Sequence, residues 1–195
     1  MTLQFSEPIT TIQEQRFTLP GYYNWEQFEA MESLIKDAPV RITYLDGCVE
    51  FITLGEAHEQ ISRVLTIFIA LYLFEKGIKF IPVGSATRTD KSKDVSFQPD
   101  ESYYLGDKKE HPDLAIEVTI TSCSIDKLEK YKRLKIAEVW FWENNQILLY
   151  RLRENGYEQI FKSEFLPDLD MALLMRCVQM SDILAARTEF IKGMR

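Results

Sequence analysis

The order of the expected elements predicts an α/β or α+β domain in which helices flank one mixed β-sheet. Apolar residues recur at helical spacing in several segments, whereas two other segments alternate apolar and polar residues around an Asp-Gly or Asn-Gly pair. A continuous apolar strand over residues 113–120 is followed by a helical segment and a second apolar strand. Such a unit predicts a parallel pair of strands joined by a right-handed crossover.

The chain is expected to form an N-terminal arm and one domain. Residues 1–20 are polar and rich in threonine, which is typical of an arm. Residues 21–195 are predicted to be a single domain, because 195 residues are ordinary for one domain and no linker rich in Pro, Gly or Ser divides the chain. The domain opens with a helix over residues 24–35 that has Asn24 as its N-cap. Its apolar residues at helical spacing are Trp25, Phe28, Met31 and Ile35.

A hairpin and a long helix come next. The hairpin spans residues 40–53 and turns at Asp46-Gly47, a pair that favours a tight turn between strands. The helix spans residues 56–76 and is ended by Gly77 at the C′ position. Apolar residues lie nearly all round this helix, which indicates a core helix or a subunit contact.

Strands and helices then alternate to the end of the chain. Two strands are expected over residues 78–82 and 95–104, separated by a polar and basic segment over residues 87–94. After the strand over 113–120, a helix is expected with Ser124 as its N-cap and Asp126 in its first turn. The later elements are that helix over 124–135, a strand over 138–142, a hairpin over 146–161 turning at Asn155-Gly156, and helices over 168–178 and 181–192.

Composition limits the class of protein. The net charge of −7 argues against a protein coated with basic residues for non-specific nucleic-acid binding, although it leaves room for a local basic patch. The most apolar run, Val64–Phe74, has 11 residues, fewer than the roughly 20 needed to cross a bilayer. No signal-peptide pattern opens the sequence, and no CxxC pair is present, so a cytoplasmic protein is predicted. We expect reduced thiols at Cys48, Cys123 and Cys177.

Two carboxylates are predicted to face each other across a pair of strands. If the strands pair antiparallel with Tyr104 opposite Asp113, Asp100 lies opposite Glu117. Because side chains alternate along a strand, the residues of the strand over 113–120 divide between its two faces. One face carries Ala115, Glu117 and Thr119, and the other carries Leu114, Ile116 and Val118.

Two ionised carboxylates in an apolar sheet repel each other and are costly to bury. They can share a proton, pair with Lys or Arg, or bind a hard divalent cation. Oxygen ligands favour Mg²⁺ or Mn²⁺ over Zn²⁺, and with only His58 and His111 in the chain a zinc hydrolase or a Ser-His triad is disfavoured. The alternative is structural: Glu117 pairs with a lysine near the end of its strand, and Asp100 is a turn residue after Pro99.

Lys127 is expected to return to this pair, because it lies in the first turn of the helix that follows the strand of Glu117. The carboxyl ends of strands are where open α/β sheets usually hold their sites. An ammonium there could position a water molecule and offset phosphate charge. The alternative is a solvated lysine on a basic helix.

The segment PDESYY…HPDLAIEVTITSCSIDKLEKYKRLKIAEVWFW resembles a known family. This is the putative restriction endonuclease family, formerly a domain of unknown function, in the PD-(D/E)XK nuclease superfamily. The likeness continues through YLDGCVEFITLGEAHEQISRVL, ILLYRLRENGYEQI and LPDLDMALL, and covers roughly residues 40–180. The resemblance implies a restriction-endonuclease-like core, a mixed β-sheet flanked by helices, preceded here by the N-terminal helix and hairpin. It also implies cleavage of phosphodiester bonds with Mg²⁺.

The resemblance assigns the metal ligands by position. Asp100 matches the Asp of the Pro-Asp motif, and Glu117 matches the acidic residue of (D/E)XK. The backbone carbonyl of Val118 is the third ligand by analogy. The usual lysine position is Thr119, which cannot supply a positive charge. The resemblance implies that Lys127 on the following helix takes over that role.

Two further site assignments depend on the resemblance. Lys130 is the fallback for the site lysine, because it lies about one turn beyond Lys127. Glu59 matches the accessory acid that many superfamily members carry at the start of a helix, with Glu56 and His58 as neighbours that could serve instead. Acidic residues there could also simply complement the helix dipole.

The leading interpretation is a Mg²⁺-dependent endonuclease acting on DNA. A homodimer is also expected, because the long apolar helix could form a subunit contact and a dimer suits the cutting of both strands of a DNA duplex. Two alternatives remain open: a non-catalytic nuclease-fold protein that binds nucleic acid or a protein partner, and a hydrolase of a small phosphodiester. Basic residues could frame a groove for phosphates, or they could form a solvated helix face. The candidate nucleic-acid contacts are Lys130, Lys132, Arg133, Arg88 and Lys91, with Lys93 and Lys135 nearby.

Overall fold

The computed structural model describes residues 14–119 and 127–194, and its architecture confirms the predicted fold class. One mixed sheet has the strand order β11-β10-β9-β8-β7-β4, in which β8 and β9 run parallel as expected and all other neighbours are antiparallel. Its strands are β4 (Phe80–Pro82), β7 (Glu101–Leu105), β8 (Leu114–Thr119), β9 (Glu138–Glu143), β10 (Gln146–Arg153) and β11 (Gly156–Ile160).

The N-terminal hairpin belongs to a second sheet, where a single sheet was expected. Its strand order is β1-β3-β2-β6-β5, and every pair in it is antiparallel. Part of the expected arm therefore forms an edge strand, because β1 pairs with β3. The strands are β1 (Gln15–Thr18), β2 (Arg41–Leu45), β3 (Cys48–Thr53), β5 (Arg88–Asp90) and β6 (Val95–Phe97), with a 3₁₀ turn over Lys91–Lys93 between the last two.

The prediction of one strand over residues 95–104 is wrong. The segment is two strands, β6 and β7, which lie in different sheets and are separated by Gln98, Pro99 and Asp100. Proline has no backbone N–H and cannot donate to a strand ladder, so the ladder breaks at Pro99. As a result, Asp100 lies where the chain crosses from the five-stranded sheet to the six-stranded sheet.

The helices begin and end close to where the sequence predicts. Asn24 caps the first helix in a reciprocal capping box with Gln27, and Gly77 ends the second helix with φ 64°. The predicted cap Ser124 and the residue Asp126 lie outside the described residues. The helices are α1 (Trp25–Leu34), α2 (Glu56–Glu75), α3 (Lys127–Arg133), α4 (Met171–Val178) and α5 (Ile183–Gly193).

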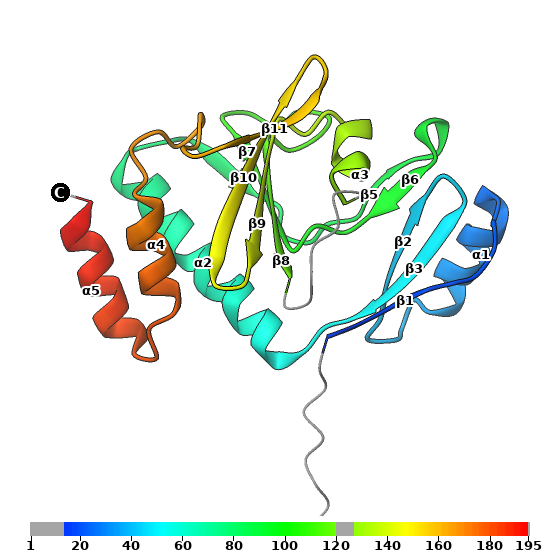
Figure 1. Cartoon of the computed structure of the whole chain (residues 1–195), viewed down its shortest axis with the longest axis horizontal. Helices are drawn as coiled ribbons and strands as arrows, with labels where there is room; N and C mark the ends of the chain where they lie inside the picture. Colours follow the sequence, from blue (N-terminus) through cyan, green and yellow to red (C-terminus); the bar gives the residue numbers. More distant parts are fainter. Residues whose placement is uncertain (1–13, 120–126, 195) are drawn as a thin grey trace, which may run out of the picture.

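The elements are stacked in layers (Figure 1). Helices α2, α4 and α5 cover one face of the six-stranded sheet, α3 lies between the two sheets, and α1 covers the far face of the five-stranded sheet. None of the helices within 14–119 and 127–194 is long and apolar enough to cross a membrane.

Strand β8 divides its side chains between two cores, as predicted from its alternation. Leu114, Ile116 and Val118 pack in the core formed with α2, α4 and α5. Ala115 packs on the opposite face, in a second core with Tyr131 of α3. Glu117 shares this second face, so its carboxylate is directed away from α2 and toward α3.

Candidate active site

Asp100 and Glu117 lie side by side in the predicted register. Strands β7 and β8 pair Glu101 with Ile116, so the position before Glu101 lies opposite Glu117. Both acidic residues are buried, with exposures of 5% for Asp100 and 4% for Glu117. The backbone N–H of Val118 donates to Asp100 Oδ2 at 2.7 Å, which holds the aspartate against the strand of its partner.

The Asp100 carboxylate is surrounded by donors from three different elements. Arg41 of β2 donates from Nη1 to Oδ1 through a short ion pair. His58 of α2 places Nε2 3.0 Å from Oδ2, beside the Val118 N–H. Burial alone would lower the pKa of His58, but the hydrogen bond and the charge of Asp100 outweigh it and raise that pKa.

The Glu117 carboxylate is held by α3. Lys130 places its ammonium 3.1 Å from Oε1, and the Tyr131 hydroxyl donates to the same oxygen. Burial raises the pKa of Glu117, but Lys130, the Tyr131 hydroxyl and the charges of Lys127 and Arg16 outweigh it and bring it down to about 2. Glu117 is therefore ionised at neutral pH, and it does not need to share a proton with Asp100.

Basic side chains thus compensate the acidic pair. Of the three remedies expected from the sequence, the described residues supply pairing with basic side chains, through Arg41, His58 and Lys130. These groups come from β2, α2 and α3, so the centre joins both sheets and two helices.

The two candidate lysines occupy different places beside this pair. Lys130 contacts Glu117 directly and its side chain is 7% exposed. Lys127 donates to the Thr119 hydroxyl at 3.1 Å, one alternate position further along the same face of β8. The two lysines therefore lie beside the carboxyl end of β8. Lys127 contacts Thr119, the residue at the usual lysine position of the superfamily.

Glu59, the predicted accessory acid, lies at the edge of the centre. Glu59 Oε1 is 4.0 Å from Arg41 Nη2, and its other oxygen is 3.5 Å from Arg63, with the side chain 42% exposed. His58, the neighbour considered as a substitute, is the residue that contacts Asp100. Glu56, the other neighbour, is exposed at the start of α2.

The predicted phosphate contacts do not form one free basic face. Lys130 is engaged by Glu117, and Arg88 donates to the Tyr104 hydroxyl at 3.3 Å. Arg133 forms a two-point ion pair with Asp46 of the β2–β3 turn. The exposed members of the set are Lys91 and Lys132, the latter 3.8 Å from Glu129.

Sequence reasoning missed Arg41, Tyr131 and Arg16. Alternation along β2 shows only that Arg41 lies opposite to the core-facing Ile42, and it does not indicate which carboxylate is within reach. Tyr131 has the helical spacing of an ordinary core residue, so its hydroxyl contact with Glu117 left no signal in the pattern. Glu117 was found because an acidic residue inside an apolar strand is an exception, and Asp100 was found from the assumed strand pairing and the Pro-Asp motif.

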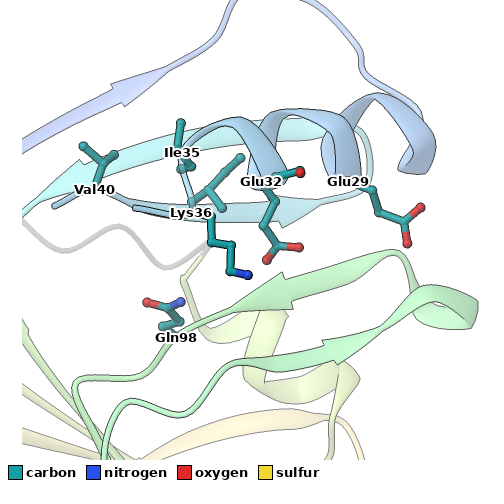
Figure 2. Close-up of a pocket in the computed structure, with 8 residues that line it drawn as sticks. Glu29, Glu32, Ile35, Lys36, Val40 and Gln98 are labelled. Carbon is teal, nitrogen blue, oxygen red and sulfur yellow. The ribbon is translucent and has the colours of Figure 1, made fainter. Parts of the chain in front are cut away.

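Two pockets flank the five-stranded sheet. One of about 320 Å³ lies between this sheet and α3, and Lys127 and Lys130 form its α3 wall. The sheet wall consists of Thr18, Thr43, Leu45, Cys48 and Glu50. The other pocket, of about 460 Å³, lies on the α1 side, where Glu32 and Lys36 point toward the segment after β6 that carries Gln98 (Figure 2).

The donor set fits a hard divalent cation of the kind that the family implies. Among residues 14–119 and 127–194, no group of three or more His, Cys, Asp or Glu side chains converges to hold a metal ion. Mg²⁺ usually needs only one or two carboxylates, with water and substrate phosphate completing its shell. Asp100 and Glu117 meet that requirement, but an ion between them has to compete with Arg41 and Lys130 for the same oxygens.

Comparison with known families identifies the family of the chain. The family model of Uma2, described as Putative restriction endonuclease, matches residues 25–185. A search of the curated proteins gives no match. The matched segment runs from α1 into α5 and contains both carboxylates together with Arg41, His58, Lys130 and Tyr131. The chain therefore belongs to the Uma2 family of putative restriction endonucleases.

Proposed function

We propose that the protein is a Mg²⁺-dependent endonuclease that hydrolyses phosphodiester bonds in DNA, with Mn²⁺ able to replace Mg²⁺. The observation that carries the proposal is the buried pair of Asp100 and Glu117, which lies between two sheets and is ringed by cationic side chains. Two adjacent carboxylates are a donor set that a hard cation can use, because Mg²⁺ usually takes one or two protein carboxylates and completes its shell with water and substrate phosphate. Family membership adds the reaction class.

In this proposal Asp100, Glu117 and the Val118 carbonyl hold the ion. When bound, the ion polarises the scissile phosphate and lowers the pKa of the attacking water. Glu117 is suited to this role because its pKa of about 2 keeps it ionised across the physiological range. Arg41 and Lys130 keep both carboxylates in place before the ion enters.

The other site residues act on the substrate and the water. Lys127, fixed near the end of β8 by Thr119, orients the attacking water and offsets charge on the phosphate. Glu59 lies beyond Arg41 and assists through a second water or ion. Lys91 and Lys132 contact DNA phosphates outside the centre, whereas Arg133 is held by Asp46 and Arg88 supports Tyr104 between the two sheets.

Nicking of supercoiled plasmid in Mg²⁺, with EDTA as the blank, tests the proposal. Asp100→Asn and Glu117→Gln should each reduce cutting at least about a hundredfold, the order of loss seen when one group that stabilises transition-state charge is removed. Glu101→Gln is the matched control, because Glu101 is buried next to Asp100 but accepts from Thr66 instead. Cutting by both site variants at the wild-type rate would refute the assignment.

A non-catalytic role in binding nucleic acid or a protein is the second candidate. It is favoured by Thr119 at the usual lysine position and by the cations that already neutralise Asp100 and Glu117. A protein that binds DNA equally in Mg²⁺ and in EDTA, and never cuts it, would support this role. The third possibility is hydrolysis of a small phosphodiester. Hydrolysis of such compounds in Mg²⁺ by a protein that does not cut DNA would identify it.

A homodimer in the cytoplasm is part of the proposal. Helix α2 is a core helix, as expected, but Ile67 and Phe74 on it are exposed at 45% and 71%. They lie seven positions apart, and residues so spaced share one helix face, which a second copy could cover. The thiols of Cys48 and Cys177 are free, which suits the reducing cytoplasm that the proposal assumes, and Cys123 lies outside the described residues.

The dimer is tested by mass in solution. Light scattering at micromolar concentration should give twice the chain mass, and Phe74→Ser should halve it.

A further inference from the structure

We propose that the pocket between α3 and the five-stranded sheet binds one nucleotide of the DNA, next to the phosphate that is cut. The inference rests on the proposed endonuclease function and deepens it, because it assigns a substrate subsite and a residue that selects the base. The pocket measures about 320 Å³. This lies at the small end of the roughly 300–1,000 Å³ typical of small-ligand sites, and so suits a single nucleotide better than a duplex.

The pocket is built by the alternation of side chains in the N-terminal hairpin. Ile42, Tyr44 and Val49 face α1 and form the core beneath that helix. The intervening residues face the other way and line the pocket. From the hairpin these are Thr43, Leu45, Cys48 and Glu50. One face of the sheet thus stabilises the fold, and the opposite face is left for recognition.

The pocket shares a wall with the catalytic centre. Lys130 lines the pocket and also lies 3.1 Å from Glu117 Oε1. Lys127 lines it as well and donates to Thr119 at the end of β8. A phosphate held near these two lysines therefore lies beside the acidic pair. The sugar and base attached to that phosphate would then extend into the pocket, toward the hairpin.

The chemistry of the lining predicts a preference among bases. An ionised carboxylate can only accept hydrogen bonds, and Glu50 offers one at the sheet wall, held 3.5 Å from Arg16. Cytosine, adenine and guanine carry an exocyclic amino group that can donate to it, whereas thymine offers only its ring N3–H, which is flanked by two carbonyl oxygens that a carboxylate repels. Leu45 contributes apolar contact, and none of the lining residues within 14–119 and 127–194 is aromatic, so hydrogen bonding rather than stacking should decide the selection.

Cys48 gives a direct readout of occupancy, because its thiol is exposed and lines the pocket. The full chain is alkylated with iodoacetamide in EDTA, with or without dCMP, dAMP, dTMP or inorganic phosphate, and the labelled peptides are quantified by mass spectrometry. At roughly ten times its dissociation constant, dCMP leaves about a tenth of the pockets empty and should slow alkylation about tenfold. We expect dTMP to bind about tenfold more weakly, the order of one hydrogen bond to a charged acceptor.

Two variants make the result specific. Glu50→Gln should remove most of the preference for dCMP over dTMP, because an amide can donate as well as accept. Ser33→Cys places a control thiol in the pocket on the α1 side (Figure 2), where nucleotides should give no protection. Parallel arms with CMP and dCMP distinguish RNA from DNA as the source of the nucleotide.

The outcomes separate this inference from the proposed function. Equal protection by inorganic phosphate and dCMP would overturn it, because the pocket would then hold an anion only. Cleavage of DNA without any nucleotide protection of Cys48 would also overturn it, while leaving the nuclease intact. If dCMP protects Cys48 in EDTA but the protein never cuts DNA, the nucleotide pocket would be supported and the proposed endonuclease function would be refuted.

Discussion

Replacing Lys130 with methionine is expected to destabilise the folded protein by about 3 kcal/mol, because it leaves the Glu117 carboxylate buried without its ammonium partner. Methionine keeps most of the length of the lysine stem. It can therefore retain the packing of that stem near Phe97 and Tyr131, whose ring centroids lie 4.9 Å and 5.4 Å from the ammonium. The substitution mainly removes the charge.

The magnitude follows from the proton affinity of Glu117. Burial alone would raise its pKa, yet the surroundings lower it from 4.5 to about 2. At about 1.4 kcal/mol for each tenfold change in proton affinity, this corresponds to roughly 3 kcal/mol in favour of the ionised form. Lys130 is the largest of the groups that oppose burial. Removing one partner of a buried pair typically costs about 3–5 kcal/mol, which agrees.

Urea unfolding followed by circular dichroism at pH 7.5 measures the effect. A double-mutant cycle isolates the pair: Lys130→Met and Glu117→Gln are measured singly and together. The double variant should recover roughly 2 kcal/mol relative to Lys130→Met alone, because no unpaired charge is then buried. Lys132→Met is the matched control on the same helix. Its side chain is 46% exposed, so it should change stability by less than about 0.5 kcal/mol.

A small effect would refute this reasoning. If Lys130→Met cost less than about 1 kcal/mol and the cycle gave no coupling, Glu117 would be stabilised by solvent or by Tyr131 instead. The acidic pair would then be open to water rather than held by the fold.

Three further predictions concern pH and a helix cap. The pKa of Glu117 is lowered, so its contribution to stability is present above pH 4.5 and is lost as the pH falls toward about 2; Glu117→Gln should flatten this acid limb in urea titrations, and an unchanged limb would contradict the assignment. The pKa of His58 is raised by Asp100 despite burial, so its contribution is full below pH 6.5 and declines as the pH rises through the raised value. The difference in free energy of unfolding between wild type and His58→Gln should therefore narrow as the pH rises. A difference that widens with pH would show that the pKa of His58 is lowered rather than raised. Asn24→Ala removes the capping box of α1 and should cost about 1 kcal/mol in thermal unfolding, with Ser33→Ala on the exposed side of α1 as the neutral control.

Local signals in the sequence were sufficient for most elements. Asp46 and Gly47 have φ of 46° and 79°, the left-handed pair that a tight hairpin turn requires, and the Asp-Gly pair marks that turn in the sequence. The cap at Asn24 and the terminator Gly77 likewise act through their own backbone groups. The register that places Asp100 opposite Glu117 was assumed by pairing Tyr104 with Asp113, and the structure has that register; a shift of two residues would have kept both acids on one face, so the pattern alone did not decide it.

The second sheet and the partners of the acids were not predictable. Alternation shows which face a side chain occupies, but not which element covers that face. Arg41 reaches Asp100 across 59 positions of the chain, and His58 does so across 42, so tertiary packing alone decides these contacts. Pro99 did carry a usable signal, since a proline inside an expected strand argues for a break.

Calorimetric titration of Mg²⁺ and Mn²⁺ into the metal-free protein tests the central claim most directly. The account predicts binding of one ion per chain by the wild type and by the control Glu101→Gln. It predicts no binding by the double variant with Asp100→Asn and Glu117→Gln, which lacks both carboxylates. The claim would be contradicted if the wild type took up neither ion, or if the double variant bound it unchanged.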